Sequence, residues 1–166
     1  MKKTLEGVIK QVKKKSFGIL STIDPSGWVQ SSGVQYGVSS RGADFALYVL
    51  SDRRYVKVRN IEQNHRVSFV IPFPHHFLRF IPAPTVSFKG TVEILPFDDS
   101  SAREAYCSRS QKRMIRFTAN SDYKATAVFL RLTPIKRIVC YGLGIKLADM
   151  MRDPANALYT VQLSGK

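Results

Sequence analysis

The order of hydrophobic and polar residues predicts one amphipathic helix followed by a series of strands. Leu5, Val8 and Val12 recur at helical spacing with lysines between them, so we expect a helix within residues 1–15. From Ser16 the pattern becomes extended. Strands are expected at residues 17–23, 28–39, 45–50, 66–71, 85–95, 124–132 and 135–141. The turn at residues 24–27, with Pro at its second position, makes the first two strands a hairpin.

Other segments interrupt the strands. Residues 53–64 have a helical pattern that places Val56 and Ile61 toward the core. Residues 72–84 contain four prolines and are expected to form a long loop. Another helix is expected after Pro96, where capping residues begin. Residues 145–166 are expected to form a short helix and a tail.

Six or seven strands in hairpin order, with few helices between them, favour a mainly β fold. An antiparallel barrel fits this order better than a doubly wound parallel sheet. The 166 residues, 44% of them hydrophobic, can bury one good core, so we expect a single domain over residues 1–166. A barrel of this size fills its interior with its own side chains. A ligand would then lie outside the barrel, against another element or subunit, which suggests a dimer.

The chain is strongly basic. It has 26 Lys and Arg against 12 Asp and Glu, a formal net charge of +14. This charge favours anionic partners such as nucleotides, nucleic acid or an acidic membrane face. A non-enzymatic nucleic-acid-binding protein is therefore one alternative, supported by the cations within residues 103–116. Against it, the aromatic residues follow the strand patterns and are not set between cations.

Cysteine and histidine residues indicate no metal site. Cys107 and Cys140 are far apart in sequence, and whether they pair is left open. His75 and His76 are interpreted as loop residues, because adjacent side chains point in different directions. No apolar run approaches the roughly 18–20 residues that span a bilayer, and the N-terminus does not resemble a secretory signal, so we expect a cytoplasmic protein.

Residues 47–71 carry the strongest chemical signal, a strand, a helix and a second strand with cations at the first junction. Ser51 ends the first strand, and Arg53, Arg54 and Lys57 surround the expected helix start. A hydroxyl, cations and free backbone N–H groups together suit a phosphate. Gly33, within the preceding strand, indicates either a bulge or close approach by a ligand or another backbone.

The same stretch carries a family resemblance. Its motif is Lys57, Asn60, Ile61, Glu62, Asn64, Arg66, Val67 and Ser68. With the preceding hairpin and basic turn, this motif resembles the pyridoxamine phosphate oxidase-like flavoproteins, the FMN-binding split-barrel superfamily. The resemblance runs from about residue 17 to residue 95 and implies a homodimeric split barrel with two FMN molecules in grooves between subunits.

The resemblance also implies positions for the cofactor. Ser51 and Lys57 would hold the phosphate with Arg53 and Arg54 nearby, the strand from Ser32 would run beside the isoalloxazine, and Thr85 would lie near its pyrimidine edge. The expected cofactor-binding residues are Ser32, Gly33, Val34, Gln35, Leu50, Ser51, Arg53, Arg54, Lys57 and Thr85.

Two departures from the family pattern narrow the expected activity. Ser32 stands where the oxidase itself carries an arginine, and Val56 replaces a basic residue. The carboxy-terminal Arg and Trp motif of the oxidase is absent, since the only tryptophan is Trp28. We therefore expect an FMN-dependent oxidoreductase or flavin reductase, acting with a small-molecule electron donor or acceptor, that does not oxidise pyridoxamine phosphate. A deazaflavin or a haem in the same groove is the alternative.

Overall fold

A computed structural model describes residues 3–39, 45–74 and 82–163 of the chain. The eight strands of this part are β1 Phe17–Ile23, β2 Val29–Gln35, β3 Gly37–Val38, β4 Leu47–Asp52, β5 Arg66–Pro72, β6 Thr85–Pro96, β7 Ala127–Tyr141 and β8 Leu158–Gln162. They form one sheet in the order β2-β1-β5-β6-β7-β4-β3, and β8 also pairs with β7. All the pairings are antiparallel. The mainly β, antiparallel split barrel is confirmed.

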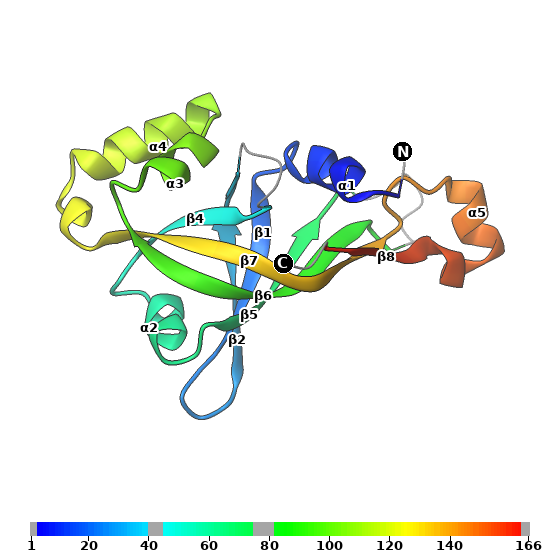
Figure 1. Cartoon of the computed structure of the whole chain (residues 1–166), viewed down its shortest axis with the longest axis horizontal. Helices are drawn as coiled ribbons and strands as arrows, with labels where there is room; N and C mark the ends of the chain where they lie inside the picture. The colour runs from blue at the N-terminus through cyan, green and yellow to red at the C-terminus, as the bar shows by residue number, and fades with distance from the viewer. Residues whose placement is uncertain (1–2, 40–44, 75–81, 164–166) are drawn as a thin grey trace.

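Helices lie around the curled sheet (Figure 1). They are α1 Leu5–Val12, α2 Val56–Gln63, α3 Ser100–Ala105, α4 Arg109–Ala119 and α5 Leu147–Arg152, with short 3-10 helices η1 Asp122–Ala125 and η2 Pro154–Ala157. The prediction of one helix after Pro96 is corrected to two. The Ser108 hydroxyl accepts from the Gln111 N–H, and the Gln111 side chain accepts from the Ser108 N–H. This capping box starts a new helix at Arg109.

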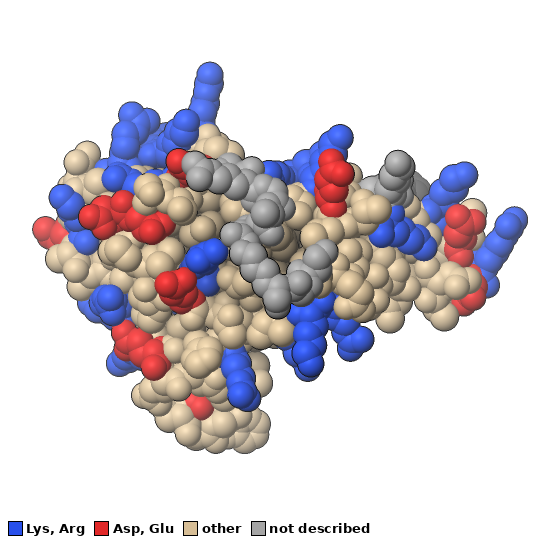
Figure 2. Space-filling model, viewed as in Figure 1, with Lys and Arg blue, Asp and Glu red and all other residues tan. Residues whose placement is uncertain are grey.

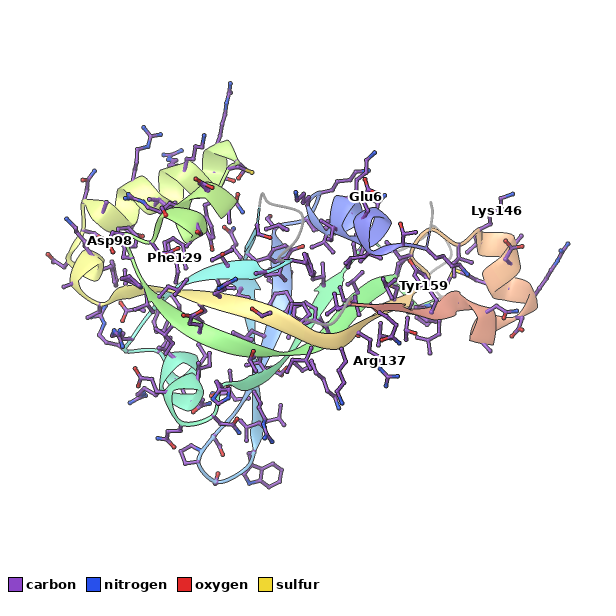
Figure 3. The ribbon with its side chains drawn as sticks, in the orientation of Figure 1. Glu6, Asp98, Phe129, Arg137, Lys146 and Tyr159 are labelled. Carbon is purple, nitrogen blue, oxygen red and sulfur yellow. The ribbon has the colours of Figure 1, made fainter. Side chains whose placement is uncertain are left out.

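Two larger hydrophobic clusters pack against the sheet, and a third, small one joins α5 and η2. The larger fills the barrel and includes Leu20, Tyr36 and Phe69, all fully buried. The smaller lies between the sheet and the α3–α4 pair, where Tyr106 packs edge-on against Phe129 with ring centroids 5.4 Å apart. Figure 3 shows Phe129 on the side of the sheet that these helices cover. The second cluster fixes α3 and α4 to one end of the sheet.

Several element predictions differ from the structure. Helix α2 begins at Val56 instead of residue 53, and Val56 is 43% exposed while Val58 takes its expected place in the core. Strand β7 runs without a break through Pro134. Pro134 pairs with Gly90, and the register between β6 and β7 shifts just beyond it, between Phe88 and Gly90. The tail forms β8, an element that its short, weakly alternating pattern did not reveal.

The structure also bears on the predictions for Gly33, the cysteines and membrane-spanning helices. Gly33 pairs in regular register with Ile19, so the bulge is excluded, and a Cβ there would lie 2.9 Å from the Phe17 ring. Both cysteines are free, Cys107 exposed and Cys140 buried. His75 and His76 lie outside the described residues. Within the described part of the chain, no helix has the length and apolar character needed to cross a membrane.

Candidate anion-binding site

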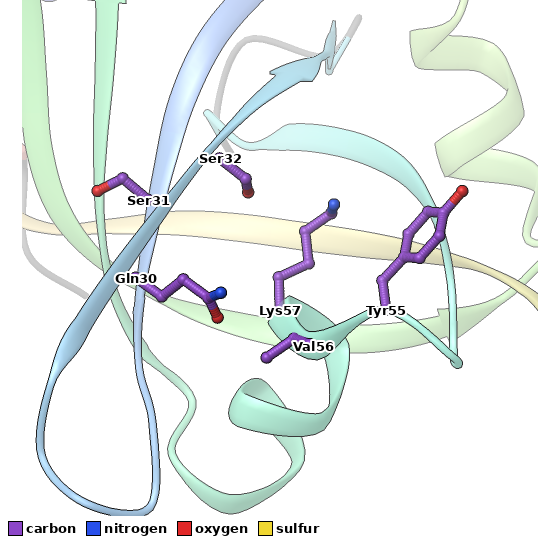
Figure 4. Close-up of a pocket in the computed structure, with 6 residues that line it drawn as sticks. All are labelled: Gln30, Ser31, Ser32, Tyr55, Val56 and Lys57. Carbon is purple, nitrogen blue, oxygen red and sulfur yellow. The ribbon is translucent and has the colours of Figure 1, made fainter.

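A pocket of about 220 Å³ opens between strand β2 and the start of helix α2. Its lining is Gln30, Ser31, Ser32, Tyr55, Val56 and Lys57 (Figure 4). In this view the Lys57 side chain extends from α2 into the space between Ser32 and Tyr55. The structure thus brings together Ser32 and Lys57, two predicted cofactor residues that are 25 positions apart in the sequence.

Lys57 supplies positive charge in this pocket. Its ammonium nitrogen lies 4.7 Å from the centroid of the Tyr55 ring, and no ion pair of Lys57 occurs within the described residues. Burial lowers the pKa of Lys57, because the charged form loses hydration. An anion in the pocket would restore a favourable environment for that charge.

The helix start adds backbone donors to the lysine. Tyr55 is the N-cap of α2 and its side chain makes no capping hydrogen bond, and the first turn contains no acidic residue. The first N–H groups of a helix have no acceptor within the helix. The Val58 N–H already donates to the Tyr55 carbonyl at 3.0 Å. An anion at this end of α2 would accept hydrogen bonds from the N–H groups of Val56 and Lys57 and interact favourably with the helix dipole.

Two predicted site residues have buried hydroxyl groups without a hydrogen-bond partner. They are Ser32 on β2 and Ser51 on β4. An unsatisfied buried polar atom costs free energy, and a native structure normally provides a partner for it. Ser32 lines the pocket, where a ligand with acceptor oxygens would satisfy its hydroxyl, whereas Ser51 is not among the lining residues. The Ser32 hydroxyl therefore fits a phosphorylated group such as the FMN that the sequence predicts, and a role for Ser51 in holding the phosphate stays a prediction.

Asn60 fixes the wall of the pocket. It is 3% exposed, and its side-chain nitrogen donates to Thr22 Oγ1 at 3.1 Å and to Gln30 Oε1 at 3.3 Å. These bonds tie α2 to the β1–β2 hairpin. Sequence reasoning placed Asn60 in the family motif but missed Gln30 and Tyr55 as pocket residues, because nothing local marks them.

The arginines of the basic turn have other partners. Arg54 forms a bidentate pair with the buried Asp52, at 2.8 and 2.9 Å, and its guanidinium lies 5.3 Å from the Tyr123 ring centroid. Arg53 pairs with Glu62 at 3.2 Å. Neither arginine lines the pocket. Their expected role as neighbours of a phosphate stays a prediction.

The remaining predicted positions lie apart from the pocket lining. Val34 is buried in the barrel core, and Gly33 faces the Phe17 ring. Thr85 pairs with Pro72 at the far end of β5, the strand that starts just after α2. Thr85 is not among the residues that line the pocket.

A second, broader groove of about 1050 Å³ follows the outer face of the sheet. Its lining combines the cations Arg66, Lys89, Lys136 and Arg137 with the apolar Ile23, Val29 and Ile135. Arg137 extends from β7 on this outer side (Figure 3). This groove continues the apolar face of the β1–β2 hairpin, where Phe17, Ile19 and Val29 are exposed.

The fold is an antiparallel split barrel, and its pocket at the start of α2 is lined by one cation, Lys57. The family model for pyridoxamine 5'-phosphate oxidase matches residues 5–139, most of the chain. The chain belongs to the pyridoxamine 5'-phosphate oxidase family. A search for relatives among curated proteins gave no match.

Solved structures share the fold at low sequence identity. A haem-binding protein of Mycobacterium smegmatis has a TM-score of 0.67 and 16% identity, over 95% of this chain and 57% of that one. A haem storage protein of Vibrio cholerae has a TM-score of 0.63 and 17% sequence identity, over 81% of this chain and 93% of that one. A conserved hypothetical protein of Mycobacterium tuberculosis has a TM-score of 0.59 and 21% sequence identity, over 80% of this chain and 81% of that one. These similarities show the fold alone.

Proposed function

We propose that this protein is an FMN-binding oxidoreductase whose cofactor phosphate occupies the pocket at the start of α2. The observation that carries the proposal is the meeting of Lys57, the unpartnered Ser32 hydroxyl and the uncapped end of α2 in one pocket. A phosphate dianion needs this combination of a cation, a hydroxyl and backbone N–H groups. Membership of the family supports the choice of a phosphorylated cofactor.

The protein's residues would bind and orient, and FMN would supply the redox chemistry by accepting and passing on electrons. Lys57 neutralises the phosphate charge, while Ser32 donates to a phosphate oxygen. Asn60 keeps β2 and α2 at a fixed spacing through Thr22 and Gln30. We place no residue in the electron transfer itself.

The cofactor pocket requires a second subunit. About 220 Å³ is below the roughly 300–1000 Å³ typical of small-molecule sites, so one chain would enclose only part of an FMN. Exposed Phe17, Ile19 and Val29 lie on one outer face of the β1–β2 hairpin, a suitable contact surface for another copy. We therefore propose a homodimer, with the flavin ring covered by the partner.

Haem and deazaflavin remain alternatives because two of the similar structures are of haem-associated proteins. None of the six pocket-lining residues is a His, Cys or Met, and Tyr55 is the only one of the six of a type that can ligate haem iron, although its ring packs against the Lys57 ammonium. The lining therefore favours a phosphorylated flavin. Absorbance spectra of the reconstituted protein distinguish the three cofactors.

The decisive experiment is reconstitution with FMN. Wild type should retain a flavin absorbance spectrum after desalting, and Lys57→Met should weaken FMN binding at least about tenfold, because a charge-assisted bond is lost. Removing the half-buried charge should leave the unliganded protein equally or more resistant to heat. Lys112→Met, an exposed lysine on α4, is the control and should bind FMN normally. A wild-type protein that never retains flavin contradicts the proposal.

A second candidate function is the binding of single-stranded nucleic acid by helix α4. Its outer face carries Arg109, Lys112, Arg113 and Arg116, all exposed, and α4 contains no acidic residue. Phe117 is 68% exposed beside them. Figure 2 shows Lys and Arg gathered over this helix. Cations beside an exposed aromatic ring suit single-stranded nucleic acid. Phe117, on a helix and exposed, is an exception to the expectation that the aromatic residues follow the strand patterns.

A further inference from the structure

The split between strands β2 and β4 begins at a specific place. Strand β3 pairs with β4 through Gly37 with Tyr48 and Val38 with Leu47. Continuing this register by two residues places Gln35 of β2 opposite Leu50 of β4. The pairing nevertheless stops at Gly37, and within the described sheet β2 pairs with β1 alone.

The side chain of Tyr106 occupies the position where the next ladder bond would form. Its hydroxyl accepts from the Leu50 N–H at 2.7 Å and donates to the Gln35 carbonyl at 3.2 Å. In a continuous sheet this N–H and this carbonyl would bond directly, about 2.9 Å apart. One oxygen atom therefore stands between the two strands, satisfying both backbone groups while holding them apart.

Backbone geometry shows that the Gln35 carbonyl faces the split. The Tyr36 N–H donates to the Ser16 carbonyl, on the β1 side. In a trans peptide the preceding carbonyl points in the opposite direction. The Gln35 carbonyl is thus turned away from β1 and toward β4, where only Tyr106 reaches it among the described residues.

The surroundings of Tyr106 hold it in this place. The residue is fully buried and packs on Phe129. A Cβ at Gly37 would lie within 2.5 Å of the Ala105 carbonyl oxygen, so only glycine lets the end of α3 approach β3 this closely. Gln111, at the start of α4, donates to the Tyr36 carbonyl at 2.8 Å. Burial also raises the pKa of Tyr106, which keeps its hydroxyl protonated and able to donate.

The geometry points to Tyr106 as a wedge that opens the cofactor site by keeping β2 and β4 apart. The two orphaned hydroxyls lie just beyond it, since Ser51 follows Leu50 on β4 and Ser32 precedes Gln35 by three residues on β2. Tyr106 does not line the pocket and acts on it through its hydrogen bonds to β2 and β4, so it is a positioning residue. This inference rests on the proposed FMN site for its functional consequence, but the wedge itself is independent of the cofactor.

The first test measures the wedge without flavin. In Tyr106→Phe the Leu50 N–H and the Gln35 carbonyl lose their shared partner and should pair with each other. The amide protons of residues 35 and 50 then come close enough for a cross-strand nuclear Overhauser effect that the wild type lacks. If the effect stays absent in the folded variant, the two strands did not close and the wedge is overturned.

The second test measures the consequence for the cofactor. Tyr106→Phe should weaken FMN binding at least about tenfold, because a site displaced by a fraction of an ångström no longer fits its ligand. The matched control is Tyr36→Phe, which removes another fully buried hydroxyl, donating to the Val12 carbonyl at 3.0 Å beside α1. Both affinities are measured at a temperature where the variants are folded by circular dichroism.

The outcomes separate the two claims. Weaker FMN binding in Tyr106→Phe alone supports the wedge, and equal weakening in both variants shows a general loss of stability and overturns it. A wild type that binds no FMN removes the proposed function, while the amide-proton measurement still decides the wedge.

Discussion

Asp52 illustrates how single residues hold the site's framework in place. The carboxylate is 4% exposed, pairs with Arg54 and accepts from the Thr126 hydroxyl at 2.7 Å. It thus connects the end of β4 to the start of β7. Hydrogen bonds from the Arg54 side chain hold the pKa of Asp52 well below its usual range, against the opposing effect of burial.

Replacing Asp52 by Asn should therefore change how stability depends on pH. A depressed carboxyl pKa stabilises the fold above the unfolded value near 4, and this contribution is lost as the pH falls toward the folded value. We expect Asp52→Asn to lower the free energy of unfolding by roughly 1–2 kcal/mol at pH 7, a modest amount because Arg54 is exposed and partly screened. The free energy of unfolding of this variant should also fall less steeply as the pH is lowered.

Urea unfolding from pH 7 to pH 3 measures this change. Glu93→Gln is the control. Glu93 is 62% exposed in its pair with Arg131, so this substitution should change the free energy of unfolding little. Equal pH profiles for wild type and Asp52→Asn would contradict the assignment.

At the scale of elements, α4 has one face for the fold and one for solvent. Ile115, Thr118 and Gln111 are buried against the sheet, while the four cations and Phe117 point outward. The buried face closes the cluster around Phe129, so α4 is needed for stability whatever its outer face binds.

The outer face of α4 gives a prediction for nucleic acid. If it binds a single strand, Arg113→Glu with Arg116→Glu should weaken oligonucleotide binding and reduce the steepness of its salt dependence by about two phosphate contacts. Lys13→Glu with Lys14→Glu, after α1, makes the same change in net charge elsewhere. Equal losses in both variants would mean that overall charge, not α4, attracts the ligand.

At the scale of the whole molecule, the proposed homodimer would cover both the pocket at the start of α2 and the apolar face of the β1–β2 hairpin. Val29→Lys should prevent the proposed homodimer from forming, because it places a charge in the proposed contact, and should weaken FMN binding along with it. Phe117→Lys is a matched control, since Phe117 is 68% and Val29 67% exposed. Sedimentation equilibrium measures the mass. A Val29→Lys variant that remains dimeric would place the interface elsewhere.

Local chemistry was sufficient for much of this molecule. The alternating strands, the helix at residues 5–12 and the motif around Lys57 were all predictable, because their signals lie within a few residues of each other. Ser32 and Lys57 were both predicted as cofactor residues, and the pocket unites them. Strand β8 escaped prediction because a short edge strand has little pattern of its own.

Only the tertiary structure decided which distant groups meet. Arg53 looks like a phosphate ligand in sequence, but the structure pairs it with Glu62, nine residues further along on α2. Tyr106 is 71 residues from Gln35 and 56 from Leu50, so no local rule could link them. The sequence by itself determined most of the elements through their periodicity, and its charge predicts an anionic ligand. Three-dimensional packing decided where the barrel splits, because that depends on a hydroxyl held between two strands by a separate hydrophobic cluster.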